Sequence, residues 1–381
     1  MYVIGILSFI LLLSTLVGAP VLPELSKELG ASDTQVPIIV SSALATVVVL
    51  QFFSGTLADR FNPKRLLLVG ALLGSVSSLL CVVATDWSQL LALRIIGGVA
   101  DAISMPVLLL ITATLGKDKP GKFFGILRSS QGLSFIAGPA LGAAFSLISL
   151  RSPFLIDGIL SLVAVVAIAL LMRDEVKKEG EHAPNPNLLK TLKTIFIDKR
   201  IYAYILLGMS ALFGFSIVYT FVASKSKILG FTPWQLGLII TAGALVFTIV
   251  SFFTGILSDR GYRKHMVITS QIIIITSGIG LALWGNSYTS IILIYSLFCA
   301  GEAMAFLLSF VYGAKIFESR HMGTAMGAFD SVIDLSLMIG PIIGISVYAA
   351  TQQFAPVFYI VCIPAVLGLV GMTFHRAFDV K

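Results

Sequence analysis

The chain has 381 residues, of which 57% are hydrophobic and only 12% are charged, and its mean hydropathy is +0.98. A water-soluble domain of this size needs more polar surface than this composition provides, so the sequence indicates a protein embedded in a bilayer. The net charge of +7 does not indicate a nucleic-acid-binding protein, because the basic residues lie in alternate loops and do not form one patch.

Twelve apolar runs of roughly 20 residues follow one another along the chain, and each is long enough to cross about 30 Å of hydrocarbon. Backbone groups in lipid must bond within the chain, so these runs are expected to be helices; porin-like strands would be shorter and alternating. The first run is too long for a signal-peptide core and lacks a basic start, so we interpret it as a span. The predicted spans are 3–24, 35–57, 66–85, 89–113, 122–146, 153–172, 201–223, 234–257, 265–284, 289–313, 322–347 and 353–375.

Most of the lysines and arginines lie in loops that follow even-numbered spans, such as the group Lys117, Lys119, Lys122 and Arg128 around the loop after the fourth span. By the positive-inside rule, both termini and the central loop are expected in the cytoplasm, so the chain is predicted to be a multi-pass protein of an inner or plasma membrane. The cysteines lie inside predicted spans, and their spacing predicts neither a disulfide nor a metal site. They are Cys81, Cys299 and Cys362.

The chain contains an internal repeat. The stretch FFSGTLADR at 52–60 returns as FFTGILSDR at 252–260, and GILRSSQGLSFIAGPALG at 125–142 returns as GAFDSVIDLSLMIGPIIG at 327–344. Each half of the chain contains one copy of both motifs and six predicted spans, and both halves start from the same side of the membrane. We therefore expect a parallel repeat of two bundles. The predicted domains are a first bundle at 1–172, a cytoplasmic linker at 173–200 with a short amphipathic helix at 187–196, and a second bundle at 201–381.

Three motifs resemble those of the major facilitator superfamily, and in particular its twelve-helix drug:proton antiporter branch. The loop GTLADRFNPKR, from Gly55 to Arg65, is similar to the superfamily's signature loop, although Asn62 and Pro63 replace the usual glycine and basic residue. LALRIIGG at 91–98 matches the buried arginine motif through Arg94, and IAGPALGA at 136–143 matches the Gly-Pro motif of antiporters. The resemblance covers essentially the whole chain.

This resemblance implies an all-α membrane protein with two pseudo-symmetric six-helix bundles and a central cavity. It implies a proton-coupled secondary transporter that exports small amphipathic or drug-like molecules by alternating access, as in multidrug resistance. Its energy source would be the proton gradient and not a cofactor. The signature loop is expected to act as a latch, in which a carboxylate meets the positive N-terminal end of a neighbouring helix. The alternative is that these residues only set topology. The latch residues are Gly55, Asp59, Arg60, Arg65, Asp259 and Arg260.

Ionisable residues inside the spans are costly there and usually functional. Arg94 and Asp101 are seven residues apart, nearly two helical turns, and so share a face of the fourth span. Glu302 aligns with Asp101 in the repeat. We expect Asp101, Glu302 and Asp334 to bind and release protons, and Arg94 to be their charge partner. The alternative is that these carboxyl groups only form hydrogen bonds between helices. Two further acidic residues are Asp330, which lies one turn before Asp334, and Asp157, which is nearer the outer end of the sixth span.

The Gly-Pro runs of the fifth and eleventh spans are predicted hinges, because small residues four apart allow close helix packing and a proline removes a helical hydrogen bond. The alternative is ordinary packing. The hinge residues are Gly138, Pro139, Gly142, Gly340, Pro341 and Gly344. Aromatic residues of the seventh span are candidates for binding amphipathic or cationic ligands. With Asp330, the candidate substrate residues are Tyr202, Phe215 and Tyr219.

Enzyme signatures are absent from the sequence: it has no phosphate-binding Gly-Lys-Ser/Thr loop and no HExxH motif. We therefore expect neither an ATP-driven pump nor an enzyme. The expected partners are a small-molecule substrate, protons and the lipid bilayer, with no nucleic acid, and the chain is expected to be monomeric. Three alternatives stay open at this stage. The first is the same fold with another cargo or direction: a sugar or metabolite exporter, a lipid flippase or an inward proton symporter. The others are a non-transporting membrane receptor or structural protein, and a channel.

Overall fold

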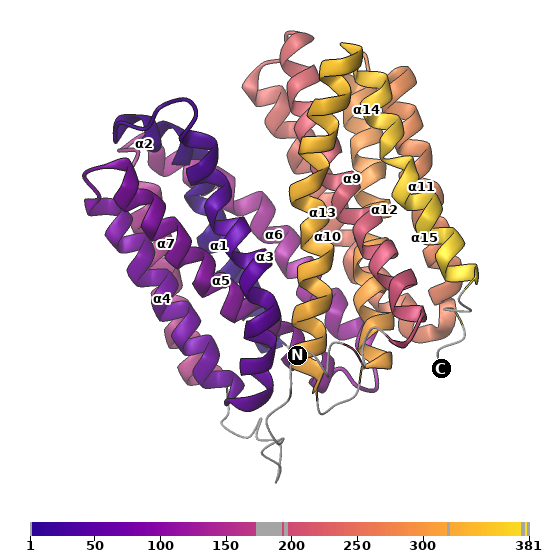
Figure 1. Cartoon of the computed structure of the whole chain (residues 1–381), viewed down its shortest axis with the longest axis horizontal. Coiled ribbons are helices and arrows are strands. Elements are labelled where there is room, and N and C mark those ends of the chain that lie inside the picture. The colour runs from indigo at the N-terminus through magenta and orange to yellow at the C-terminus, as the bar shows by residue number, and fades with distance from the viewer. Residues whose placement is uncertain (1, 173–192, 194–196, 318–320, 375–377, 379–381) are drawn as a thin grey trace. The chain divides into compact units, whose positions relative to one another are not determined.

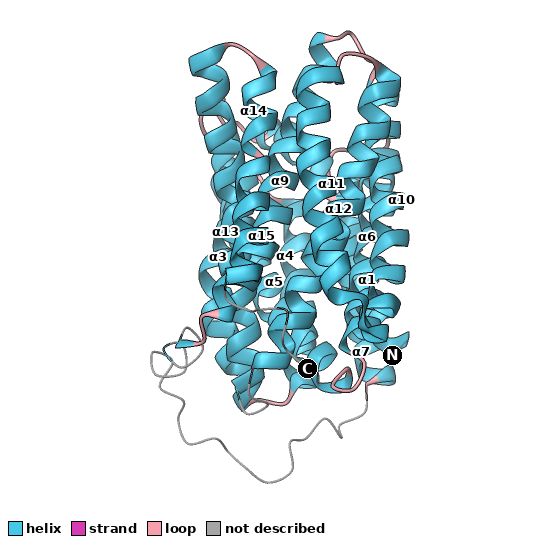
Figure 2. Ribbon diagram, turned by 90° about the vertical axis from the view of Figure 1, so that its right-hand side faces the viewer, coloured by secondary structure: helices cyan, strands magenta, loops and turns pink. Residues whose placement is uncertain are grey.

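The computed structural model describes residues 2–172, 193, 197–317, 321–374 and 378, and within them it is built from helices and loops, without strands (Figure 2). Figure 1 shows the helices as bundles of long rods. The first half of the sequence contains α1 (Tyr2–Val17), the 3-10 turn η1 (Ala19–Val21), α2 (Leu22–Glu28), α3 (Val36–Arg60), α4 (Pro63–Val83), α5 (Trp87–Leu115), α6 (Pro120–Ser146) and α7 (Ser152–Leu171).

The second half contains α9 (Arg200–Ile228), α10 (Pro233–Leu257), the π-helical turn η2 (Ser258–Tyr262), α11 (Arg263–Trp284), α12 (Tyr288–Ile316), α13 (Met322–Thr351), α14 (Phe354–Ile360) and α15 (Cys362–Phe374). Ten stretches of the described chain are long and apolar enough to cross a membrane; one of them, Pro233–Trp284, holds both α10 and α11, and α6 is not among them. The helices are consistent with the twelve predicted spans. The first predicted span, 3–24, is not one continuous helix: α1 ends at Val17, and Pro20 follows in the short turn η1.

The repeat seen in the sequence is also present in the backbone. Gly30 and Gly230 both have a left-handed φ, of +87° and +76°, which a residue with a side chain adopts only at a cost. In the turn that follows each glycine, a glutamine side chain closes the start of the next helix. Gln35 accepts a hydrogen bond from the backbone of Ser32 at 2.8 Å, and Gln235 accepts one from Thr232 at 2.9 Å. Equivalent residues of the two halves therefore form the same turn and the same hydrogen bond at the start of a helix.

The chain folds into two compact units that cut across the sequence halves. Unit 1 comprises Met1–Thr114, Leu133–Leu192 and Glu318–Ser331, and unit 2 comprises Leu115–Gly132, Lys193–Phe317 and Val332–Lys381. Helices α6 and α13 are thus each shared between the units. The predicted amphipathic helix at 187–196 lies almost entirely outside the described residues, as does most of the predicted linker, so the predicted domain boundaries stay a prediction.

Candidate functional site

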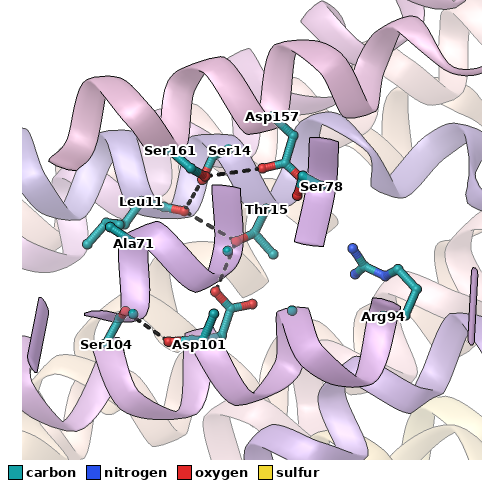
Figure 3. Close-up of a pocket in the computed structure, with 14 residues that line it drawn as sticks. Leu11, Ser14, Thr15, Ala71, Ser78, Arg94, Asp101, Ser104, Asp157 and Ser161 are labelled. Carbon is teal, nitrogen blue, oxygen red and sulfur yellow. Dashed lines mark hydrogen bonds between the residues drawn. The ribbon is translucent and has the colours of Figure 1, made fainter. Parts of the chain in front are cut away.

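A small polar pocket lies inside unit 1, between α1, α4, α5 and α7 (Figure 3). Glycines on α4 and α5 leave the space open, and hydroxyl groups from all four helices line it. It has room for roughly two water molecules, judged by the volume a buried water needs, and not for a drug-sized ligand. The lining residues are Leu11, Ser14, Thr15, Gly70, Ala71, Gly74, Ser78, Arg94, Gly97, Ala100, Asp101, Ser104, Asp157 and Ser161.

Arg94 and Asp101 both reach this pocket from α5, as their seven-residue spacing predicts (Figure 3). The Asp101 carboxylate accepts a hydrogen bond from the Thr15 hydroxyl of α1 at 3.2 Å. The Nε atom of Arg94 is buried and has no hydrogen-bond partner among the described residues. A guanidinium that is incompletely bonded beside carboxyl groups can change partner, which is what a proton-coupling site requires. The proton-coupling role itself stays a prediction.

Asp157 is brought into the same pocket by α7, although its place in the sequence suggested a position nearer the membrane surface. Its side chain is 4% exposed, and it accepts a hydrogen bond from Ser78 of α4 at 2.7 Å and a longer one from Ser161 at 3.5 Å. The signal that could have found it is the pair Asp157 and Ser161, four residues apart and therefore on one face of an otherwise apolar helix.

Glu302 lies in unit 2, on α12, and is 5% exposed. Within the described residues it makes neither a hydrogen bond nor an ion pair, and its electrostatic neighbours are Tyr295 and Cys299 on its own helix. A charge is costly in such surroundings, so this site suits a neutral, protonated carboxyl group. Asp330 and Asp334 are one turn apart on α13; Asp330 is 5% exposed and Asp334 is half-buried. Neither lines the polar pocket of unit 1.

Asp59 closes the start of α13, inside unit 1. Its two carboxylate oxygens accept hydrogen bonds from the backbone N–H groups of Gly323 and Thr324, at 2.8 and 2.7 Å, and the Thr324 hydroxyl donates a third at 2.7 Å. These N–H groups belong to the first turn of α13, where no intrahelical acceptor exists and the helix dipole favours a negative charge. The predicted contact between Asp59 and a helix N-terminus is confirmed; its role as a latch stays a prediction.

Asp259 makes the equivalent contact inside unit 2, at the start of α6. It accepts hydrogen bonds from the N–H groups of Gly121 and Lys122, at 2.9 and 2.7 Å. Arg263, one turn further along, brings its guanidinium within 3.7 Å of the same carboxylate. The remaining latch candidates are exposed, near the ends of their helices, and their role as latch residues stays a prediction. They are Arg60, Arg65 and Arg260.

Glycines bring the helix backbones together beside both carboxylates. A Cβ atom at Gly55 would lie 2.5 Å from the carbonyl oxygen of Gly323, and one at Gly255 would lie 2.8 Å from the Cα atom of Gly125. A side chain at Gly55 would force α3 and α13 apart, and one at Gly255 would force α10 and α6 apart. Gly55 therefore allows the backbones of α3 and α13 to approach closely, while its role in a latch stays a prediction.

We expect Gly255→Ala to weaken the packing of α10 on α6 by about 1–3 kcal/mol, the usual cost of overfilling a packed contact. The matched control is Gly237→Ala on the same helix, where an added Cβ meets nothing within 4 Å. That variant is expected to be as stable as the parent or more stable, by up to about 1 kcal/mol. Thermal denaturation of the purified protein in detergent measures both. Equal stability of the two variants would show that the contact at Gly255 tolerates a side chain.

Arg128 is a residue that sequence reasoning placed wrongly, with the basic group of a loop. It is 5% exposed inside α6, and its guanidinium lies 4.0 Å from the ring centroid of Phe306 and 4.5 Å from that of Phe310, both on α12. It also donates a hydrogen bond to Gln131 at 2.8 Å. Phe rings attract a buried cation through their negative faces, so these two contacts help to stabilise an arginine in the interior.

The Gly-Pro runs pack closely on the first helix of each sequence half, and α6 and α13 both continue through their prolines. In unit 1, a Cβ at Gly138 would lie 2.6 Å from the Cβ of Leu16, and Gly142 lies against Val17. In unit 2, Gly340 and Gly344 lie against Ser216 and Phe221 of α9. Close packing is thus confirmed at these four glycines, while bending at Pro139 and Pro341 stays a prediction.

The aromatic candidates of α9 do not form one surface. Tyr202 is 44% exposed at the very start of the helix, far along it from Phe215 and Tyr219, whose ring centroids are 5.5 Å apart. Tyr219 is 43% exposed. Tyr204, by contrast, is fully buried and stacked on Tyr312 at 5.0 Å, where it holds α9 to α12. Phe215 and Tyr219 together remain candidates for ligand contact. Tyr202 is a separate candidate, since it lies away from these two residues on α9.

Comparison with known proteins covers nearly the whole chain. The chain is 27% identical over 354 residues to the quinolone resistance protein NorA of Staphylococcus aureus (strain MSSA476), a match that spans 88% of this chain and 86% of that protein. It is also 27% identical over 361 residues to the multidrug resistance protein 1 of Bacillus subtilis (strain 168), which spans 92% of this chain and 89% of that protein.

Two solved structures have the same fold. FucP, a transporter of the Major Facilitator Superfamily crystallised in the outward conformation, has a TM-score of 0.84 at 12% identity, with 98% of each chain covered. The human organic anion transporter MFSD10 (TETRAN) has a TM-score of 0.74 at 17% identity, with 97% of this chain and 98% of that chain covered. The family model of the Major Facilitator Superfamily matches residues 4–232 and 204–378. With both halves matched, this chain belongs to the Major Facilitator Superfamily.

Proposed function

We propose that the chain exports small amphipathic, drug-like organic molecules in exchange for protons. Transporters of this superfamily work by alternating access, with one substrate cavity opened to each side of the membrane in turn. The observation that carries the proposal is similarity, over about nine-tenths of the chain, to two proteins named for drug resistance. A sugar or metabolite exporter, a lipid flippase and a non-transporting receptor are less favoured, because neither resistance protein is named for such a role.

The positions of the charged residues support the following proposed roles. Asp101, with Arg94 beside it, would exchange a proton in unit 1, and Glu302 would do so in unit 2, with Asp334 as a further candidate. Asp59 and Asp259 would hold two helix starts closed in one state of the cycle and release them in the other, which shifts a two-state equilibrium without contact to substrate. No organic cofactor or metal enters this scheme, since the proton gradient supplies the energy.

The proposed setting is the plasma membrane, with both termini in the cytoplasm and the chain acting as a monomer. The distribution of lysine and arginine supports this orientation: Arg60 and Arg65 flank one loop, and Arg260, Arg263 and Lys264 flank its counterpart in the repeat. Both loops adjoin the helix starts that Asp59 and Asp259 close. The latches would therefore face the cytoplasm.

The test is proton flux in proteoliposomes that contain a pH-sensitive dye. Lipophilic cations, neutral drugs, sugars and lipid headgroup analogues are added in turn. We expect lipophilic cations or neutral drugs to trigger a change of internal pH in the parent protein. The change should be lost in Asp101→Asn and in Glu302→Gln. Asp33→Asn is the control, because it removes a carboxylate whose side chain is 90% exposed. A response to sugars or headgroup analogues alone would contradict drug export.

A further inference from the structure

We propose that Asp157 is a second proton-binding residue, and that Asp157 and Asp101 hold one exchangeable proton between them beside Arg94. The inference rests on the proposed proton coupling and adds to it a residue and a proton count. It starts from the geometry of the pocket in Figure 3, where both carboxyl groups and the guanidinium face the same small space.

The charges around the pocket call for one added positive charge. Its lining contains two carboxyl groups and one guanidinium, so with both carboxyls ionised the set carries one uncompensated negative charge. Asp157 interacts electrostatically with both Arg94 and Asp101. The Cys81 thiol on α4 is a further titratable group near it, while the α1 residues that line the pocket, Leu11, Ser14 and Thr15, have no titratable side chain. A net charge in the apolar interior is costly, and one proton removes it.

The hydrogen bonds at Asp157 can serve both protonation states. As a carboxylate, it accepts bonds from Ser78 and Ser161, at 2.7 and 3.5 Å. As a carboxylic acid, it can still accept from Ser78 and can donate through its other oxygen to Ser161, because a hydroxyl group is both donor and acceptor. Glu302 has no such partners within the described chain, so the two sites differ. A residue that only joins two helices by hydrogen bonds would not need partners that suit both its ionised and its protonated form.

The proton exchange itself is simple. A hydronium ion from the aqueous phase transfers its proton to one carboxylate oxygen: an O–H bond of hydronium breaks, the O–H bond of the carboxylic acid forms, and neutral water is left. The reverse transfer to water releases the proton. Arg94 pairs with whichever carboxyl group is ionised, so the proton can move between Asp101 and Asp157 without a change in the total charge. Unit 1 thus binds one proton at a time at this site, and proton binding is linked to which carboxylate Arg94 pairs with.

The experiment counts titrating carboxyl groups by infrared difference spectroscopy of the full chain in liposomes as the pH is changed. We expect Asp157→Asn, Asp101→Asn and the double variant each to lose one carboxylic-acid proton relative to the parent, and the double variant to lose no more than the single ones. The reason is that one remaining carboxylate is neutralised by Arg94, so the shared proton is lost at the first substitution. Arg94→Gln should gain a proton.

Two controls separate this from a structural role. Ser75→Ala removes another buried serine that joins α4 to α7, through the Gly158 carbonyl at 2.9 Å, but lies outside the pocket lining. It should lower thermal stability and leave the proton count unchanged. Asp157→Glu should restore the count. An unchanged count in a folded Asp157→Asn, or additive losses in the double variant, would overturn the inference even if drug-triggered proton flux is observed. Absence of that flux with the count as expected would instead contradict the proposed function.

Discussion

The Glu302→Gln variant is expected to bind a transported drug but not to transport it in response to a proton gradient. The rate of gradient-driven drug transport should fall to that of protein-free liposomes. The side chain is 5% exposed and has neither hydrogen bond nor ion pair within the described residues, so glutamine replaces the protonated acid with little change in shape. The variant can no longer release a proton. Exchange of labelled for unlabelled drug across the membrane requires no proton release, and it should therefore persist.

The measurement compares drug movement driven by a pH gradient with drug exchange at equal pH, in the same liposomes. Glu302→Asp is the companion variant, because it keeps a titrating group on the same helix and should retain part of the driven transport. Loss of both driven transport and exchange in Glu302→Gln would indicate a misfolded or non-binding protein. Full retention of driven transport would show that Glu302 only packs α12.

Asp59→Ala is expected to loosen the start of α13. The substitution removes the acceptor for two backbone N–H groups and one hydroxyl. Hydrogen bonds to a charged group contribute about 1.5–3 kcal/mol each, so even one such loss, at about 2 kcal/mol, gives roughly thirtyfold faster local opening. Hydrogen exchange of the peptide that contains Gly323 and Thr324, followed by mass spectrometry, measures that opening directly.

The second copy of the motif supplies the matched control. Asp259→Ala should accelerate exchange at Gly121 and Lys122 and leave Gly323 and Thr324 at the parent rate, because Asp259 closes α6 and Asp59 closes α13. Asp59→Asn keeps one acceptor oxygen and should lie between the parent and Asp59→Ala. If Asp59→Ala left the exchange at α13 unchanged, the carboxylate would not be what holds this helix start.

Much of the candidate site could be predicted because it depends on local spacing. The spans follow from runs of apolar residues, and Arg94 and Asp101 reach one pocket because a seven-residue separation keeps them on one face of a helix. The repeat of Gly-x-Leu-x-Asp-Arg indicated that Asp59 and Asp259 do equivalent work. Which helix start each of them closes could not be predicted, since the partners lie 264 and 138 residues away in the chain.

Asp157 and Arg128 show where reasoning from one sequence ends. Asp157 counts as part of the pocket only because α7 packs on α4 with Ser78 opposite it, and a hydropathy pattern does not specify which helices are neighbours. Arg128 looks like a loop cation until two Phe rings of α12 are placed against it. In both cases the partner comes from a distant helix, and the side chain's surroundings are a property of packing.

The sequence by itself determined that this is a helical, twofold-repeated membrane protein with charged residues inside its spans, because the bilayer restricts the backbone to a few solutions. The tertiary structure decided which charges meet: Asp101 with Thr15, Asp157 with Ser78, and Asp59 with the start of α13. The physical reason is that helix formation depends on residues close in the chain. Pairing of buried polar groups depends instead on which helix faces pack together. Glycine contacts between helices distant in the sequence help to determine which faces these are.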